Sequence, residues 1–393
     1  MVHPSPPPTG SRWEQVMDYH PTGPAPHNAT RRPLLRTVLA VGVVVTVFGL
    51  AALMMGMVVF SSIGLTAAAL AMATSAIALG IVVPTFLHVD RLEAEPARLL
   101  WFAFLWGALI STLGALVLNE LGVGFVAGLD ADPMVVGAVV IAPVTEEVAK
   151  GLGIALIFWR ARREFNGITD GIVYAGLVAA GFAFVENILY LGRAYVELGT
   201  PGLVGLFVIR VLVSPFAHPM FTVGIGLAFG LVAHRRRWSS AWIVLVGLAV
   251  AIFLHALWNY SAVVAGEAYL LVFALVQIPL FLAFLLLLRW TRRRESRLLR
   301  DHLTGYGLNG WFTPVEVAML ADAGERRRAR TWARHVGGRE AERAMTAFQD
   351  ESADLAMVRK HLHSGGPDPE WLRREQVLLQ TITARRRVFL PGV

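Results

Sequence analysis

Long apolar runs with few polar interruptions fill the sequence between about residues 35 and 290. About twenty apolar residues in a helix cross the hydrocarbon core of a bilayer, so each run predicts a membrane span. The pattern predicts eight spans, at about 35–60, 62–87, 98–118, 135–159, 168–192, 201–233, 239–264 and 268–288. The sixth run is too long for a straight span and contains Pro215 and Pro219, so we expect one kinked or broken crossing. The predicted fold is an all-α, polytopic membrane helix bundle of about eight spans.

Two more polar regions flank this bundle. Residues 1–30 are rich in proline and lack hydrophobic periodicity, which predicts a disordered cytoplasmic arm without a signal peptide. Residues 31–290 form the predicted eight-span domain, and residues 291–393 form a small soluble helical tail. Thr313–Glu316 in the tail ("TPVE") has the capping pattern of a helix start, and a last helix is expected near Pro369. Nothing in the tail suggests catalysis, so we interpret it as a cytoplasmic regulatory or docking module.

Composition supports the membrane assignment and narrows the chemistry. The chain is 55% hydrophobic and 16% charged, with a mean hydropathy of +0.57. It has no cysteine, which excludes disulfides, thiol nucleophiles and cysteine metal sites. From Thr291 onward the tail has 19 Arg and Lys against 13 Asp and Glu, typical of a cytoplasmic face near anionic lipid headgroups. No motif for binding nucleic acid accompanies this charge.

The arginines in the connections predict the orientation of the chain, because positively charged loops stay in the cytoplasm. The arginines that eight spans place inside are Arg31, Arg32, Arg36, Arg91, Arg98, Arg160, Arg162, Arg163, Arg235, Arg236, Arg237, Arg289, Arg292, Arg293 and Arg294. Only Arg193 falls on the outer side. Both termini are therefore predicted to be cytoplasmic.

Ionisable and amide side chains are concentrated within four of the predicted spans. A charged side chain at the bilayer centre costs roughly 2.5–3.5 kcal/mol on insertion scales, so such groups usually face the bundle interior and are functional. They are Glu146, Glu147 and Lys150 in the fourth span, Glu186 and Asn187 in the fifth, Arg210 and His218 in the sixth, and His255 and Asn259 in the seventh. Counted at about 1.5 Å per residue from the arginine-marked ends, they share a depth at or beyond mid-membrane. We expect them to surround one cavity that opens toward the outside.

Each of these groups also has a purely structural interpretation. Glu147 and Lys150 could form a buried ion pair that fixes helix packing, and His218 could cap carbonyls freed by a proline. Arg210 is expected to be the counter-ion of a glutamate whatever the function. Interhelical hydrogen bonds are the corresponding interpretation for Glu186, His255 and Asn259. If all of them were only structural, the chain would carry the unfavourable free energy of membrane insertion several times with no function to explain it. We therefore favour a functional role for the group as a whole.

Carboxylates and histidines in a wet cavity within the membrane are suited to peptide hydrolysis. A general base can deprotonate water, and a fixed cation or hydrogen-bond donor can stabilise the oxyanion. Glutamate and histidine are also zinc ligands. Three other intramembrane protease mechanisms are excluded, because the sequence lacks the HExxH, GxSG and GxGD motifs. One of only two lysines, Lys150, stands within the "EEVAK" motif, which favours a specific role for its compact ammonium group.

Several motifs together resemble the PrsW family of intramembrane proteases. The residues that carry the resemblance are "EEVAK" at 146–150, "FAFVEN" at 182–187, Arg210 with His218, "HALWN" at 255–259 and "EPARLLWFAFLWGALIS" at 95–111. The resemblance covers about residues 35–290 and leaves out the N-terminal arm and the tail. The family is distantly similar to the CAAX-prenyl-protease and bacteriocin-processing membrane proteases.

The resemblance implies an intramembrane endopeptidase of a bacterial cell membrane. Its expected substrates are single-span membrane proteins, such as anti-sigma factors, cleaved near the membrane boundary. The implied catalytic residues are Glu146, Glu147, Glu186, His218, His255 and Asn259, with Lys150, Asn187 and Arg210 in support. In one version Glu186, His218 and His255 hold zinc, and a glutamate of the "EE" pair is the base. In the other, no metal is needed and His255 with Asn259 forms the oxyanion hole.

Two functions of other classes stay open from the residues alone. Buried Glu, His and Lys side chains also form proton relays, so an ion- or proton-coupled transporter is one alternative. Transporters of this size often contain an inverted repeat, and none is evident in the sequence. A non-catalytic membrane scaffold is the other alternative. On the protease hypothesis, Glu147→Gln abolishes cleavage without affecting stability, whereas a relay variant alters pH-dependent flux.

Overall fold

The computed structural model describes residues 34–92, 94–126, 132–162, 164–165, 167–233, 240–264, 266–365 and 368–390. The predicted arm at 1–30 and the arginines at 31, 32, 163 and 235–237 lie outside the described residues. Every regular element in the described ranges is helical, which confirms the all-α prediction. The described residues from Phe48 onward form one compact unit, separate from the part of the chain that ends at Val47.

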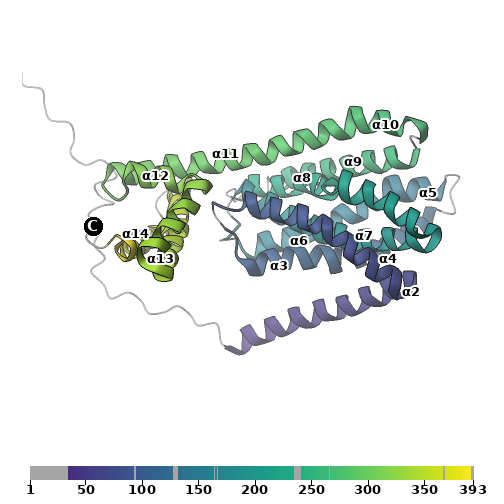
Figure 1. The fold of residues 1–393 in the computed structure, drawn as a ribbon, viewed down its shortest axis with the longest axis horizontal. Helices are drawn as coiled ribbons and strands as arrows, with labels where there is room; N and C mark the ends of the chain where they lie inside the picture. The colour runs from purple at the N-terminus through teal and green to yellow at the C-terminus, as the bar shows by residue number, and fades with distance from the viewer. Residues whose placement is uncertain are drawn as a thin grey trace, which may run out of the picture. The chain divides into compact units, whose positions relative to one another are not determined.

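Helices make up the membrane region (Figure 1), and short π-helical segments interrupt them along the chain. The α-helices are α2 (Leu34–Val89), α3 (Ala97–Leu105), α4 (Thr112–Val126), α5 (Pro133–Val136), α6 (Ala142–Arg160), α7 (Ile168–Phe207), α8 (Ala217–Val232), α9 (Ala241–Val264), α10 (Tyr269–Val272) and α11 (Ile278–Leu308). The π-helical segments are η1 (Trp106–Ser111), η2 (Gly137–Ile141), η3 (Val208–Val213) and η6 (Phe273–Gln277). Such segments occur frequently at functional sites.

Among the described residues, five helical stretches are long and apolar enough to cross a membrane. They are Val41–Val89, Ala97–Val126, Ile168–Val232, Ala241–Val263 and Phe273–Leu308. Two of them exceed the length of one crossing and contain a glycine in a left-handed conformation, Gly64 (φ 76°) and Gly199 (φ 67°). Only glycine adopts such a φ readily, so these residues mark the kinks. α6 is not among the five, because Glu146, Glu147 and Lys150 reduce its apolar character.

The predicted break in the sixth run lies at Ser214–Phe216, between η3 and α8. After the kink at Gly199 the chain folds back along the part of α7 that precedes this glycine, since Gly202 packs against the backbone of Ala194 and Arg210 bonds to Glu186. Beyond the break, α8 continues in the same direction along α7, and Gly226 lies against Gly171. The fifth predicted span ended at residue 192, but the helix continues to Gly199. The sixth run is thus one broken segment antiparallel to α7.

Close contact between α7 and α8 depends on Gly171. A Cβ atom on Gly171 would lie 2.0 Å from the carbonyl oxygen of Gly226. We expect Gly171→Ala to force the helices apart and lower the free energy of unfolding by about 1–3 kcal/mol, as overpacking does. Gly114→Ala in α4 is the matched control, because nothing lies within 4 Å of its Cβ position. Thermal unfolding of the detergent-solubilised protein checks this, and equal midpoints for the two variants would contradict it.

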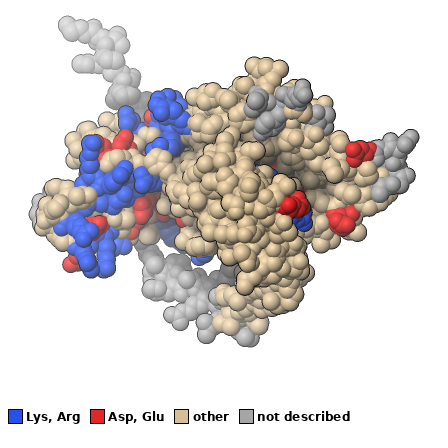
Figure 2. All heavy atoms as spheres, turned by 45° about the vertical axis from the view of Figure 1, so that its right-hand side comes forward, with Lys and Arg blue, Asp and Glu red and all other residues tan. Residues whose placement is uncertain are grey.

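The tail is continuous with the last membrane helix. The boundary expected at residue 290/291 lies within α11, which runs unbroken toward α12 (Pro314–Leu320), α13 (Ala323–Gly365) and α14 (Pro369–Phe389) (Figure 1). The predicted capping box at Thr313–Glu316 is confirmed, and α14 begins at Pro369 as expected. The tail has its own apolar core and also contacts the bundle, since the Arg326 guanidinium donates to the Leu92 carbonyl at 2.5 Å. Figure 2 shows Lys, Arg, Asp and Glu gathered over the tail, whereas the visible face of the bundle is almost entirely uncharged.

Candidate active site

The polar groups predicted to share a depth meet between α6, α7, α8 and α9. Glu146, Glu147 and Lys150 face inward from α6, and none has an exposed fraction above 5%. His218 is the second residue of α8, just after the break, and His255 lies in α9. The two imidazole rings lie edge to face with centroids 5.2 Å apart. Three separate helices, α6, α8 and α9, therefore contribute side chains to one buried cluster.

Glu147 is the most highly bonded carboxylate of this cluster. Lys150 Nζ donates to its Oε1 at 2.7 Å, and His255 Nδ1 lies 3.0 Å from the same oxygen. Thr222 Oγ1 donates to the other oxygen at 2.8 Å. Glu147 is fully buried, and its carboxylate joins α6 to α8 and α9. It therefore positions Lys150 and His255, and both of its oxygens are already engaged.

Glu146 is the opposite case, because one of its carboxylate oxygens is free. Its Oε2 is buried and has no hydrogen-bond partner in the structure. The nearest charged or imidazole nitrogens are Lys150 Nζ at 3.6 Å and His255 Nε2 at 3.8 Å, beyond normal hydrogen-bond length. An unpaired carboxylate oxygen in a membrane interior is costly. It is therefore available to a ligand that enters the cluster.

His218 connects this inner group to a third carboxylate, that of Glu186, which is more exposed. Its Nδ1 lies 3.0 Å from Lys150 Nζ, and its Nε2 lies 2.8 Å from Glu186 Oε2. The Arg210 guanidinium also donates to Glu186, and its Nε donates to Asn187 Oδ1 at 2.7 Å. Arg210 is thus the counter-ion that the sequence predicted. The Glu186 side chain has an exposed fraction of 15%, which is the largest among the carboxylates of the cluster.

Asn259 lies one turn beyond His255 in α9 and bonds to the backbone of a neighbouring segment. Its side-chain amide donates to the Ala138 carbonyl at 2.8 Å. Ala138 lies in η2, where the π-helical turn alters the regular backbone bonding. In this arrangement Asn259 ties α9 to the segment before α6. His255 itself stacks on the Phe221 ring at a centroid distance of 4.9 Å, which fixes the plane of the imidazole.

Three side chains of the cluster could hold a metal ion. One donor atom each from Glu146, His218 and His255 lies within 4.8 Å of the others, and all three residues are buried. The structure thus groups Glu146, rather than the predicted Glu186, with the two histidines. The free oxygen of Glu146 and the imidazole nitrogens form a donor set that zinc accepts. Glu147 at His255 Nδ1 and Glu186 at His218 Nε2 are also the carboxylate–histidine contacts common around protein metal ions.

Three residues that were not predicted as site residues also contact the cluster. Thr222 donates to Glu147, Phe182 has the Lys150 ammonium 4.0 Å above its ring, and Tyr190 has the Arg210 guanidinium at 4.2 Å. Their spacing from the predicted site residues could have identified them. Each lies four residues from a predicted site residue, Thr222 after His218 and the two aromatic residues on either side of Glu186, hence on the same helix face.

Comparison with known proteins identifies similar sequences but no similar solved structure. Residues 95–286 match the PrsW family of intramembrane metalloproteases. A protease PrsW of Geobacillus kaustophilus is 29% identical over 191 residues, which cover 48% of this chain and 77% of that protein. Proteins of the same name from Halalkalibacterium halodurans and Oceanobacillus iheyensis are 27% and 23% identical, over 34% and 49% of this chain and 55% and 82% of their own lengths. No solved structure matches the chain.

Proposed function

Since this chain belongs to the PrsW family and is an intramembrane endopeptidase, we propose that the cluster around Glu146 is its catalytic centre. The observation that carries the proposal is the free Glu146 oxygen, buried beside His218 and His255. The other strongly polar groups of the cluster already have partners. A purely structural polar cluster would be expected to pair this oxygen as well, because an unpaired buried acceptor costs about 1–3 kcal/mol.

Glu146, His218 and His255 are the residues that we propose to hold a metal ion, with zinc as the candidate. When bound, such an ion polarises the scissile carbonyl and lowers the pKa of its water. Glu147 holds the His255 ring by Nδ1 and leaves Nε2 facing Glu146. His218 has both nitrogens engaged and would exchange one of these contacts for the ion.

The remaining groups manage charge and protons around the scissile bond. Glu186 is the carboxylate with the most access to solvent, and we propose that it accepts the proton of the attacking water and exchanges it with the outside. The Lys150 and Arg210 cations balance the negative charge that develops in the transition state. The apolar ring of Phe182 covers Lys150, which limits the access of water to the inner part of the site.

Metal content tests the donor set without relying on activity. We expect the protein purified without chelators to contain about one transition-metal ion per chain by elemental analysis. Glu146→Gln and His255→Asn should lose this ion, because each removes one of three donors. His88→Asn, which changes a histidine outside the cluster, should keep it. A metal-free wild-type protein that still cleaves peptide bonds would contradict the proposed metal site.

The substrates that we propose are single-span membrane proteins cleaved in the outer half of the bilayer, with both termini of the protease in the cytoplasm. The arginine distribution supports this orientation. Glu147 precedes Arg160 by 13 residues of α6, which places it roughly 20 Å from the cytoplasmic end of a hydrocarbon core about 30 Å thick. Mapping the cleaved bonds of cellular membrane proteins tests this. Cleavage at the cytoplasmic boundary would contradict the orientation.

A further inference from the structure

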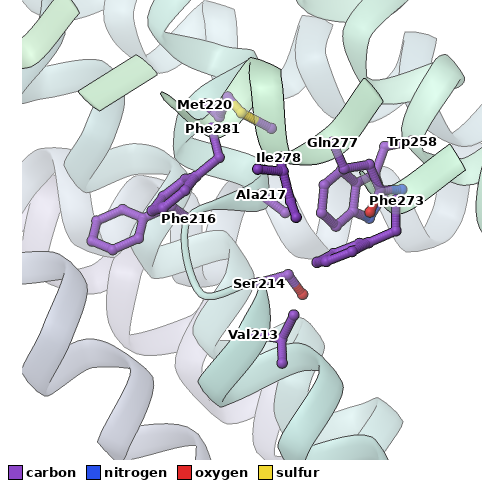
Figure 3. Close-up of a pocket in the computed structure, with 10 residues that line it drawn as sticks. All are labelled: Val213, Ser214, Phe216, Ala217, Met220, Trp258, Phe273, Gln277, Ile278 and Phe281. Atoms are coloured by element: carbon purple, nitrogen blue, oxygen red, sulfur yellow. The ribbon is translucent and has the colours of Figure 1, made fainter. Parts of the chain in front are cut away.

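A small apolar pocket lies beside the cluster, between the break before α8, α9 and the η6–α11 segment (Figure 3). Its volume is about 190 Å³. The rings of Phe216 and Phe281 form one side, with centroids 5.9 Å apart, and Trp258 and Phe273 lie on the other. An apolar cavity of about 150 Å³ is large enough to bind benzene, so this pocket accommodates a side chain of that size.

The pocket is close to the catalytic histidines. Ala217, which lines it, directly precedes His218. Trp258, also in its wall, has its ring 5.8 Å from that of Phe221, which stacks on His255. The non-helical backbone at Ser214 forms another part of the lining. A group bound in the pocket is therefore one side chain away from the site of hydrolysis.

Gln277 contributes a buried acceptor to the lining of the same pocket. Its exposed fraction is 3%, and its Oε1 has no hydrogen-bond partner in the structure. The contacts of Ser261 favour this amide orientation, because its only hydroxyl hydrogen is donated to the Trp258 carbonyl at 2.7 Å. Ser261 can then only accept, and Gln277 Nε2 donates to it at 2.5 Å. The unpaired Oε1 is therefore an acceptor that an N–H donor of a bound molecule would satisfy.

We propose, resting on the proposed function, that this pocket binds an apolar side chain of the membrane segment being cleaved. Gln277 Oε1 accepts a backbone N–H of that segment. A peptide opened for hydrolysis has unpaired N–H groups, which must be satisfied inside the membrane. A lipid acyl chain fits the apolar walls but has no donor for Gln277. The pocket would thus select cleavage sites by the size of one side chain close to the scissile bond.

Pocket size is tested with a library of single-span proteins whose membrane segments are randomised, cleaved by the full chain in vesicles and read by sequencing the new termini. Wild type should favour large apolar residues at one fixed position from the cut. Phe281→Ala should raise the rate for Trp over Leu at that position about tenfold, and Ala217→Ile should shift the preference toward Ala and Gly. The control is Leu282→Ala, which changes a neighbouring side chain outside the pocket lining and should leave the preference unchanged.

The acceptor is tested with Gln277→Met, which keeps the length of the side chain. We expect cleavage to fall roughly 5- to 100-fold for all library members alike, the equivalent of one lost buried acceptor. Ser261→Ala removes the other partner of the Gln277 amide and should have a smaller effect.

The possible failures can be told apart. If wild type cleaves no library member, the proposed function fails. If wild type cleaves but the pocket variants keep its preference, only the pocket proposal is overturned. A lipid that copurifies with wild type and not with Ala217→Ile, at unchanged preference, would assign the pocket to an acyl chain and also overturn it.

Discussion

Glu146→Gln is expected to lower the rate of peptide cleavage by more than about 100-fold. Removing a residue that hydrogen-bonds a metal ligand lowers metal affinity or activity roughly 10–100-fold. Glu146 is proposed to be a metal ligand itself, so we expect a larger loss. The fold should persist, because the Glu146 Oε2 makes no hydrogen bond that glutamine would break. We therefore expect a change in the free energy of unfolding within about 1 kcal/mol.

Single-turnover cleavage of a substrate identified by its new termini measures this effect, with thermal unfolding as the companion measurement. The informative result is the combination of lost activity with retained stability. Wild-type activity in a folded Glu146→Gln protein would remove Glu146 from the mechanism and with it the proposed metal site.

Glu147→Gln is expected to affect both activity and stability. Glu147 pairs with Lys150 at 2.7 Å in a fully buried position, so glutamine leaves the ammonium with Glu146 at 3.6 Å as its remaining carboxylate. Breaking a buried ion pair costs about 3–5 kcal/mol, and we expect the lower end because Glu146 remains. Cleavage should also be lost, because the His255 ring no longer has its carboxylate partner. The sequence alone predicted lost cleavage with unchanged stability. The contacts of Glu147 with Lys150, Thr222 and His255 now lead us to expect a loss of stability as well.

The double variant Glu147→Gln/Lys150→Met separates the two effects. It removes the uncompensated cation, so stability should recover while cleavage stays low. Chemical unfolding and the single-turnover assay measure the two outcomes. A Glu147→Gln protein as stable as wild type would contradict the role of Glu147 as the carboxylate that joins α6, α8 and α9.

Much of the architecture could be predicted because hydrophobic length and proline are local signals. The apolar runs predicted all-helical spans, and Pro215 marked the break before α8. The proximity of Glu147, His218 and His255 was predictable from their depth, since the number of residues from a helix end gives the height in a bilayer. The capping box at Thr313 was predictable from four adjacent residues.

The finer geometry could not be predicted, because it depends on helix rotation and on π-helical turns. The Ala138 carbonyl in η2 accepts a hydrogen bond from Asn259, and no residue pattern in the sequence predicts this π-helical turn. Glu186 contacts His218, but only Glu146 is grouped with both histidines, and this depends on which way each carboxylate points across the bundle. The first part of α7 continues past the predicted span end at residue 192 to the kink at Gly199. The position of this kink could not be predicted, because glycine permits but does not require a positive φ.

The measurement that tests the central claim most directly is a quantitative survey of protein termini in membranes and medium. It compares cells that express the wild-type chain with cells that express Glu146→Gln at equal levels. The predicted result is a set of new termini near the outer membrane boundary of single-span proteins, present only with the wild-type chain. Identical terminus profiles under several envelope stresses would contradict a catalytic cluster around Glu146.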